Sequence, residues 1–129
     1  MRKKLKLKFI DTKYSIIQLP KNSKIPEWLD INDTFISFTR THEELSIICK
    51  SSCVPKNKKI KQSKDWIILK IEEILDLSLF GILFSILKIL KENKISIYVI
   101  STYNTDYVLI KEKDKNKAEN CLSKYYRII

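Results

Sequence analysis

The stretch SLFGILFSILKILKEN, residues 78–93, decides how the second half of the chain folds. Four residues that are not large and apolar recur in it at intervals of four, three and four, which places them on one narrow stripe of a helix: Gly81, Ser85, Lys88 and Glu92. The remaining circumference is almost wholly apolar, so the pattern predicts a helix that is buried over most of its surface. Ser78 is a residue type that caps helix N-termini, and Asp76 lies just ahead of it.

The segments around this helix read as strands and a second helix. DWIILKIEE (65–73), ISIYVIS (95–101) and DYVLIK (106–111) are rich in Ile, Val, Tyr and Trp and favour strands. KDKNKAENCLSKYY (113–126) predicts a helix, and RII (127–129) a short last strand. The inward residues of that helix are expected to be Ala118, Cys121, Leu122 and Tyr125. The order strand, helix, strand, strand, helix, strand is ferredoxin-like: an antiparallel sheet with helices on one face.

The first half contains strands but only a trace of helix. KLKLKFI (4–10) alternates Lys with apolar residues, and YSIIQL (14–19) is a second strand candidate. TFISFT (34–39) and LSIICK (45–50) read as a strand pair around the turn RTHEE. The segment IPEWL provides at most one helical turn. SSCVPKNKKIKQSK (51–64) is a polar, lysine-rich connection and the best candidate for a boundary.

The two halves of the sequence share a pattern of apolar and polar residues. FTRTHEELSIICK overlays ISTYNTDYVLIKE when position 38 is set against 100 and position 45 against 107, and both read as strand, polar turn, strand. We therefore predict an α+β fold of two ferredoxin-like modules side by side. The first module, residues 1–62, is abbreviated, and the second covers residues 63–129.

The amino-acid composition limits the classes of protein to which this chain can belong. The chain has 129 residues, of which 44% are hydrophobic, which suits one compact domain or two small ones. The longest uncharged apolar run, 77–87, is shorter than the roughly 20 residues that span a bilayer. Three cysteines and one histidine argue against a disulfide framework and a zinc site. We expect a cytoplasmic protein with no cofactor, no metal and no membrane partner.

The formal net charge of +10 raises the question of nucleic acid. All but three of the 25 basic residues are lysines, whereas phosphate-reading surfaces usually contain more arginine. The lysines are scattered along the sequence, which favours a solvated surface. The basic clusters at residues 2–8 and 56–64 keep nucleic-acid binding open as an alternative.

Three quoted stretches carry a family resemblance: DLSLFGIL (76–83), ISIYVISTYNTDYVLIKE (95–112) and FISFTRTHEELSIIC (35–49). They resemble the small bacterial tandem ACT-domain proteins, which are related to the ACT regions of aspartate kinases and to cytosolic arginine sensors of animals. The resemblance implies two ACT-like modules and a regulatory, ligand-sensing role without catalysis, the usual ligand being an amino acid. The first module lacks a Gly-containing strand-to-helix loop, which argues against a second full site.

The expected site joins the loop before the long helix to the polar stretch 101–106. A helix N-terminus offers unpaired backbone N–H groups that suit a ligand carboxylate. Gly81, the only glycine, either lets a ligand approach the backbone or lets the helix pack closely on the sheet. The expected ligand-binding residues are Asp76, Leu79, Phe80, Gly81, Ile82, Ser101, Thr102, Tyr103, Asn104, Thr105 and Asp106.

Each polar member of this set has a second interpretation. Asp106 pairs with a ligand ammonium or only fixes the turn. Asp76 contacts the ammonium or only complements the helix dipole. Thr102, Asn104 and Asp106 share one face if the stretch is a strand, with Tyr103 as a flat wall opposite, and that parity fails if a turn intervenes. Glu43 and Glu44 serve a weaker site or a solvated turn.

The alternative function is a basic ferredoxin-like RNA-binding module. Such modules stack bases on exposed aromatic residues of a sheet, and only Tyr98, Tyr103 and Tyr107 are comparable here. An enzyme is disfavoured because the sequence offers no nucleophile–base pair and no phosphate loop. The almost wholly apolar helix and exposed sheet edges predict a homodimer, and a regulated partner protein is expected but not identified.

Overall fold

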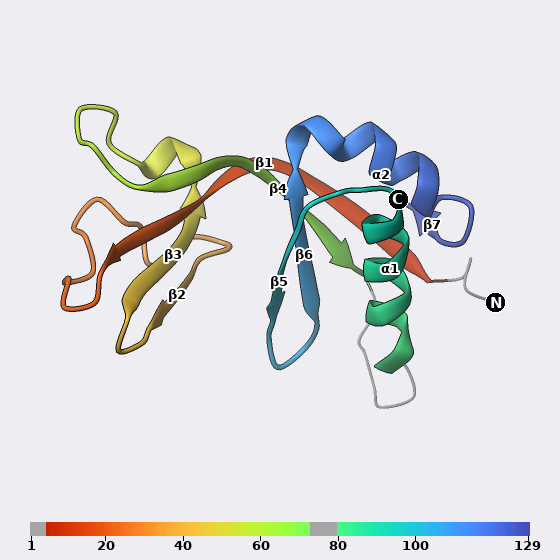
Figure 1. Ribbon diagram of the computed structural model, residues 1–129, viewed down its shortest axis with the longest axis horizontal. Helices are drawn as coiled ribbons and strands as arrows, with labels where there is room; N and C mark the ends of the chain where they lie inside the picture. The colour runs from red at the N-terminus through yellow and green to blue at the C-terminus, as the bar shows by residue number, and fades with distance from the viewer. Residues whose placement is uncertain (1–4, 73–79) are drawn as a thin grey trace. The chain divides into compact units, whose positions relative to one another are not determined.

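The computed structural model describes residues 5–72 and 80–129 (Figure 1). Contacts divide the chain into two units. Residues 1–11 and 67–129 form one, called here the C-terminal unit, and residues 12–66 form the other, the N-terminal unit. The predicted boundary at residue 62 differs from this division, because residues 1–11 group with the C-terminal half; the assignment of two modules stays a prediction. No helix among the described residues is long and apolar enough to cross a membrane.

The fold is α+β. The described strands are β1 (Lys6–Pro20), β2 (Ser37–Arg40), β3 (Glu44–Lys50), β4 (Gln62–Ile71), β5 (Ile97–Ser101), β6 (Asp106–Lys111) and β7 (Arg127–Ile128). Their hydrogen-bonding order is β2-β3-β1-β4-β6-β5, and β7 pairs with β1. The helices are α1 (Phe80–Glu92) and α2 (Lys115–Leu122), with short 3-10 turns η2 (Ser51–Cys53) and η4 (Glu112–Asp114).

Strand β1 corrects the expectation of two separate strands at 4–10 and 14–19. The chain stays extended through Asp11, Thr12 and Lys13, which are exposed. Both ends have partners: Glu72 N donates to Lys6 O at 2.9 Å, and the residues from Tyr14 onward pair with β3. Because this polar interval contains neither Gly nor Pro, nothing in it breaks the strand. Strand β4 likewise begins at Gln62, inside the predicted connection.

The C-terminal unit has its helices on one face of its strands. Ile67, Leu69 and Ile71 are fully buried, and the period-two geometry of a strand places them on one face of β4. They join Val108 and Ile110 of β6 in one core. The helices contribute the other wall of this core through Ile86, Leu90, Ala118, Cys121 and Leu122. This is the arrangement that the element order of the second half predicts.

Helix α1 is less buried than its sequence predicts. Ile86 and Leu90 are fully buried, but Phe84 is 68% exposed, and Leu83 and Leu87 are half-buried. The periodicity identifies an apolar helix correctly, yet within one chain a sheet covers only one side of a helix. The helix ends with Lys94 at φ 59°, a left-handed position, and Ile95 N donates to Leu90 O at 3.0 Å.

The C-terminus departs from the prediction in two ways. Tyr126 is buried whereas Tyr125 is 49% exposed, because α2 ends at Leu122 and the helical period stops there. Strand β7 pairs in parallel with Lys6 and Leu7 of β1. The first strand of the chain, not the last, therefore lies beside β4 in the C-terminal unit.

The N-terminal unit covers its strands with irregular chain. Ile17 of β1 and Leu45, Ile47 and Cys49 of β3 form the strand side of its core. The covering residues come from segments 21–36 and 51–60: Leu29 and Val54, with Ile25, Trp28, Ile36 and Ile60 partly buried. The expected turn at IPEWL is confirmed, since Leu29 N donates to Pro26 O at 3.1 Å. This unit thus has the shortened helix content that the sequence indicates.

Candidate functional site

The stretch 101–106 is the tip of the β5–β6 hairpin. Ser101 and Asp106 are its last paired residues. Thr102 N donates to Thr105 O at 2.8 Å, and Thr105 N donates to Thr102 Oγ1 at 3.3 Å. The Thr102 side chain therefore supplies the turn bonding that Gly or Pro usually makes possible. Because a turn intervenes, Thr102, Asn104 and Asp106 do not share a strand face.

The Asp106 carboxylate is held by the opposite strand end. Ser101 Oγ donates to Asp106 Oδ1 at 2.5 Å, a short bond of the charge-assisted kind. A carboxylate has about four lone-pair sites, and this bond uses one of them. Asp106 is therefore fixed in position by the turn while it keeps acceptor capacity.

Thr105 ties the turn to strand β4. It is 8% exposed, and its Oγ1 donates to Ile71 O at 3.4 Å. Ile71 is the last residue of β4, from which the chain continues toward α1. The hairpin turn consequently lies against the end of the strand that precedes the predicted ligand loop.

The tip of the turn points away from the unit. Tyr103 is fully exposed and Asn104 is exposed. Tyr103 therefore does not form a wall of any cavity within the described part of the chain. Of the polar set predicted from the sequence, Ser101, Thr102, Thr105 and Asp106 are bonded to one another or to β4, and Tyr103 and Asn104 face solvent.

The predicted loop is only partly described. Asp76 and Leu79, like the cap candidate Ser78, lie outside the described residues. Phe80 is the first residue of α1, and Gly81 and Ile82 follow in its first turn. A Cβ added to Gly81 would meet no atom of the described residues within 4 Å. The interpretation that Gly81 permits close packing of the helix on the sheet is therefore wrong.

The β2–β3 hairpin closes in the same way. Thr41 N donates to Glu44 O at 2.9 Å, and Thr41 Oγ1 accepts from the amides of Glu43 and Glu44 at 3.1 and 3.2 Å. Arg40 pairs with Leu45 just as Ser101 pairs with Asp106, so position 40 corresponds to 101. The sequence overlay, which set 38 against 100, is therefore one residue out of register, because turn closure rather than apolar similarity sets hairpin register.

Comparisons with known proteins agree with this architecture. A crystal structure of a protein from Agobacterium tumefaciens shares 30% sequence identity and a TM-score of 0.87, covering 98% of this chain and 92% of that one. A family model described as an ACT domain matches residues 62–124, and a model of an N-terminal domain matches residues 12–57. This chain is a small ACT-domain protein.

Two further structures show where the same fold occurs. Aspartate kinase of Clostridium acetobutylicum matches the ACT-domain protein with a TM-score of 0.64 and 11% identity, over 92% of this chain and 34% of the enzyme. A putative C-terminal regulatory domain of aspartate kinase from Porphyromonas gingivalis matches with a TM-score of 0.54 and 15% identity, over 92% and 96% of the two chains. At these identities the likeness is one of fold. No curated protein matches the sequence.

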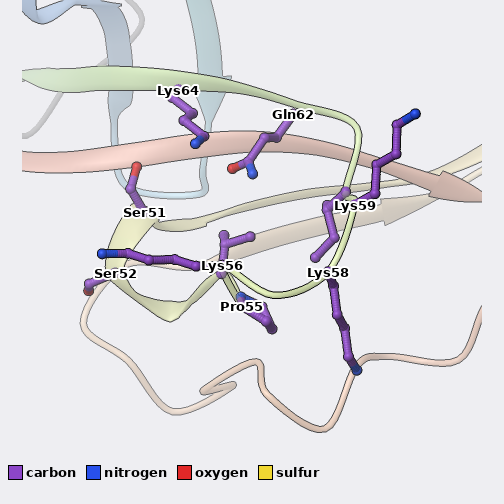
Figure 2. A pocket seen from close by; sticks show the side chains of 10 residues that line it. Ser51, Ser52, Pro55, Lys56, Lys58, Lys59, Gln62 and Lys64 are labelled. Carbon is purple, nitrogen blue, oxygen red and sulfur yellow. The ribbon is translucent and has the colours of Figure 1, made fainter.

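The ACT-domain protein also has a pocket that the sequence interpretation passed over. It lies in the N-terminal unit, has a volume of about 780 Å³, and is formed entirely by residues between 51 and 64 (Figure 2). Its lining includes four lysines and no carboxylate: Lys56, Lys58, Lys59 and Lys64. The lysine cluster was visible in the sequence, but a charge run does not reveal that a chain folds back to enclose space.

Proposed function

We propose that this ACT-domain protein is a regulatory module without catalytic activity that binds an amino acid at the β5–β6 hairpin. The observation that carries the proposal is the position of the hairpin turn. Thr105 bonds to Ile71 O, so the hairpin turn next to Asp106 lies against the end of β4, which supports a site at this end of the unit. The family and the fold of the aspartate kinase regulatory domain support a sensing role.

The chemistry follows from the two charges of an amino acid, which are costly to bury without partners. Asp106 is held by Ser101, and in the proposed complex it accepts a bond from the ligand ammonium. The first turn of α1 has backbone N–H groups without intrahelical partners, which suit the ligand carboxylate. Gly81 in that turn leaves space beside the backbone, because a side chain there would touch none of the described atoms.

The proposed module works as a homodimer that reports to a regulated protein in the cytoplasm. Phe84, on α1, is 68% exposed, and a large apolar side chain at that exposure favours contact with another surface. A second copy of the chain would cover the half-buried side of α1. Sedimentation analysis of Phe84→Ser tests this part of the proposal separately from ligand binding, since the expected result is a shift from dimer to monomer.

A thermal-shift screen of the standard amino acids tests the ligand. A ligand at about ten times its Kd stabilises the native state by about 1.4 kcal/mol, which raises the unfolding midpoint by several degrees in a chain of this size. We expect at least one amino acid to do this at millimolar concentration. If the folded protein shows no shift with any of them, the proposal fails.

A further inference from the structure

The lysine pocket of the N-terminal unit combines positive charge with hydrogen-bonding groups. Figure 2 shows the side chains of Ser51, Gln62 and Lys64 pointing toward one another, with Lys56 extending toward Ser52. Gln62 and Lys64 are two residues apart in β4, so they project from the same strand face. Lys58 and Lys59 extend away from this group at the rim.

One polar atom of the pocket lacks a partner. Gln62 Oε1 is buried and accepts no hydrogen bond from any described residue. A buried amide oxygen without a donor is unfavourable, so such an atom calls for an explanation. Ser51, which lines the same pocket, is held in place, since its Oγ lies 2.8 Å from Oγ of the fully buried Ser15. The pocket therefore presents a positioned hydroxyl and an acceptor that needs a donor.

We propose that this pocket binds a small phosphorylated molecule that also carries hydroxyl or amino groups. Lysine binds phosphate as a point charge, and the pocket lining has four lysines and no carboxylate, so its charge suits an anion. The phosphate contacts Lys56, Lys64 and the two serine hydroxyls. A hydroxyl or amino group of the ligand donates to Gln62 Oε1, and Val54 and Ile60 form an apolar wall.

The volume and composition favour a small molecule over a bare ion. About 780 Å³ lies within the usual range of small-molecule pockets and exceeds what inorganic phosphate fills. Inorganic phosphate also leaves the apolar wall unused. This site is separate in sequence from the hairpin of the C-terminal unit, so it goes beyond the proposed amino-acid function and does not depend on it.

Isothermal titration at constant ionic strength tests the proposal, with ADP, ribose 5-phosphate and inorganic phosphate as probes. We expect ADP or ribose 5-phosphate to bind about tenfold more tightly than inorganic phosphate, because each has a hydroxyl donor for Gln62 that is separate from its phosphate and a larger body that reaches the apolar wall. No binding of either organic phosphate below about 10 mM overturns the proposal. Tighter binding of a uridine oligonucleotide than of ADP also overturns it, in favour of a nucleic-acid surface.

Matched variants separate the pocket from general charge. Lys56→Gln with Lys64→Gln is expected to weaken organic phosphate binding at least about tenfold. Lys113→Gln with Lys117→Gln removes the same charge from exposed positions of the C-terminal unit and should leave the affinity within about twofold. Equal losses in the two double variants would show non-specific attraction and overturn the site.

Gln62→Leu tests the hydrogen bond without changing charge. It should reduce the preference for organic over inorganic phosphate while the affinity for inorganic phosphate is kept. An unchanged preference contradicts the role of Gln62. Circular dichroism and thermal melting of the unliganded variant check that it is folded. If Gln62→Leu is misfolded, Gln62→Glu replaces it in the titration, because it keeps the shape of the side chain and adds a charge that repels phosphate.

Discussion

The two hairpins of this chain close identically and differ in what they contact. In each, a threonine N–H bonds to the carbonyl three residues on, at 2.9 Å from Thr41 and 2.8 Å from Thr102. The first hairpin is then anchored by Arg40, which donates to Lys21 O and Ser23 O at 2.5 and 2.7 Å. The second is anchored by Thr105 to the end of β4. Turn closure is common to the units, whereas the anchor differs.

The cover of the two sheets differs as well. The C-terminal unit packs two helices on its strands, and the N-terminal unit uses irregular chain. Irregular chain packs on a sheet less evenly than a helix does. The lysine pocket lies in this irregular segment, between residues 51 and 64. The lysine pocket therefore lies where the cover of the strands is not α-helical.

The largest effects are expected in the cores of the hairpins. Ile47 and Val108 occupy equivalent positions, and both are fully buried. We expect Ile47→Ala to lower the free energy of unfolding by about 3 kcal/mol and Val108→Ala by about 2 kcal/mol, from lost burial plus a cavity. Urea unfolding measures both. A change below about 0.5 kcal/mol in either variant would show that its core is not packed as described.

Alkaline pH should weaken the N-terminal unit. Burial, and next the neighbouring Cys53, raise the pKa of the Cys49 thiol from 9.0 to about 11. The unfolded thiol loses its proton near pH 9 while the folded one keeps it, so stability is full below pH 9 and falls by about 2–3 kcal/mol toward pH 11. Urea unfolding across this range should show a shallower decline for Cys49→Ala. Parallel declines would contradict the shift.

The Thr105 hydrogen bond that anchors the second hairpin should contribute less to the free energy of unfolding than the core residues do. Thr105→Val keeps the shape but removes the bond to Ile71 O, and we expect a loss of about 1 kcal/mol in the free energy of unfolding. Thr39→Val, at an exposed position of β2 in the first hairpin, is the control and should change stability by less than about 0.5 kcal/mol. Equal effects would remove the distinction between the hairpins.

Gly81→Ala should have the smallest effect on the free energy of unfolding, and it should raise that free energy whereas the other variants lower it. Alanine favours helix over glycine, and a Cβ at this position meets no described atom, so we expect a gain of about 0.5 kcal/mol. If a ligand uses the space beside the Gly81 backbone, the same variant binds it more weakly although it is more stable. A loss of stability would show that Gly81 is needed by the fold itself.

Much of this architecture could be predicted from composition and periodicity. The Ile, Val, Tyr and Trp content of β4 and β6 and the 3.6-residue period of α1 identify these elements of the C-terminal unit, and consecutive residues of both strands are buried. Partner choice could not be predicted this way: β1 continues through Asp11–Lys13, and β7 pairs with β1. Those outcomes depend on hydrogen bonds between residues distant in sequence, which leave no local pattern.

The candidate site shows the same limit. Ser101, Thr102 and Asp106 stand out as polar residues between apolar strands, but the Ser101–Asp106 bond depends on the register of the turn. Thr105 resembles its neighbours in sequence, yet it alone is buried and reaches β4. The RNA-binding alternative gains no support, since the most exposed tyrosine, Tyr103, lies in a turn and not on a sheet face.

The most direct measurement is isothermal titration of the most stabilising amino acid into the wild-type protein, Asp106→Asn and Glu43→Gln. Both variants remove one negative charge from a hairpin, but only Asp106 belongs to the proposed site, and the Glu43 side chain is 77% exposed. The account predicts at least about a tenfold loss of affinity for Asp106→Asn and a change within about twofold for Glu43→Gln. Equal affinities for all three proteins would contradict amino-acid binding at the β5–β6 hairpin.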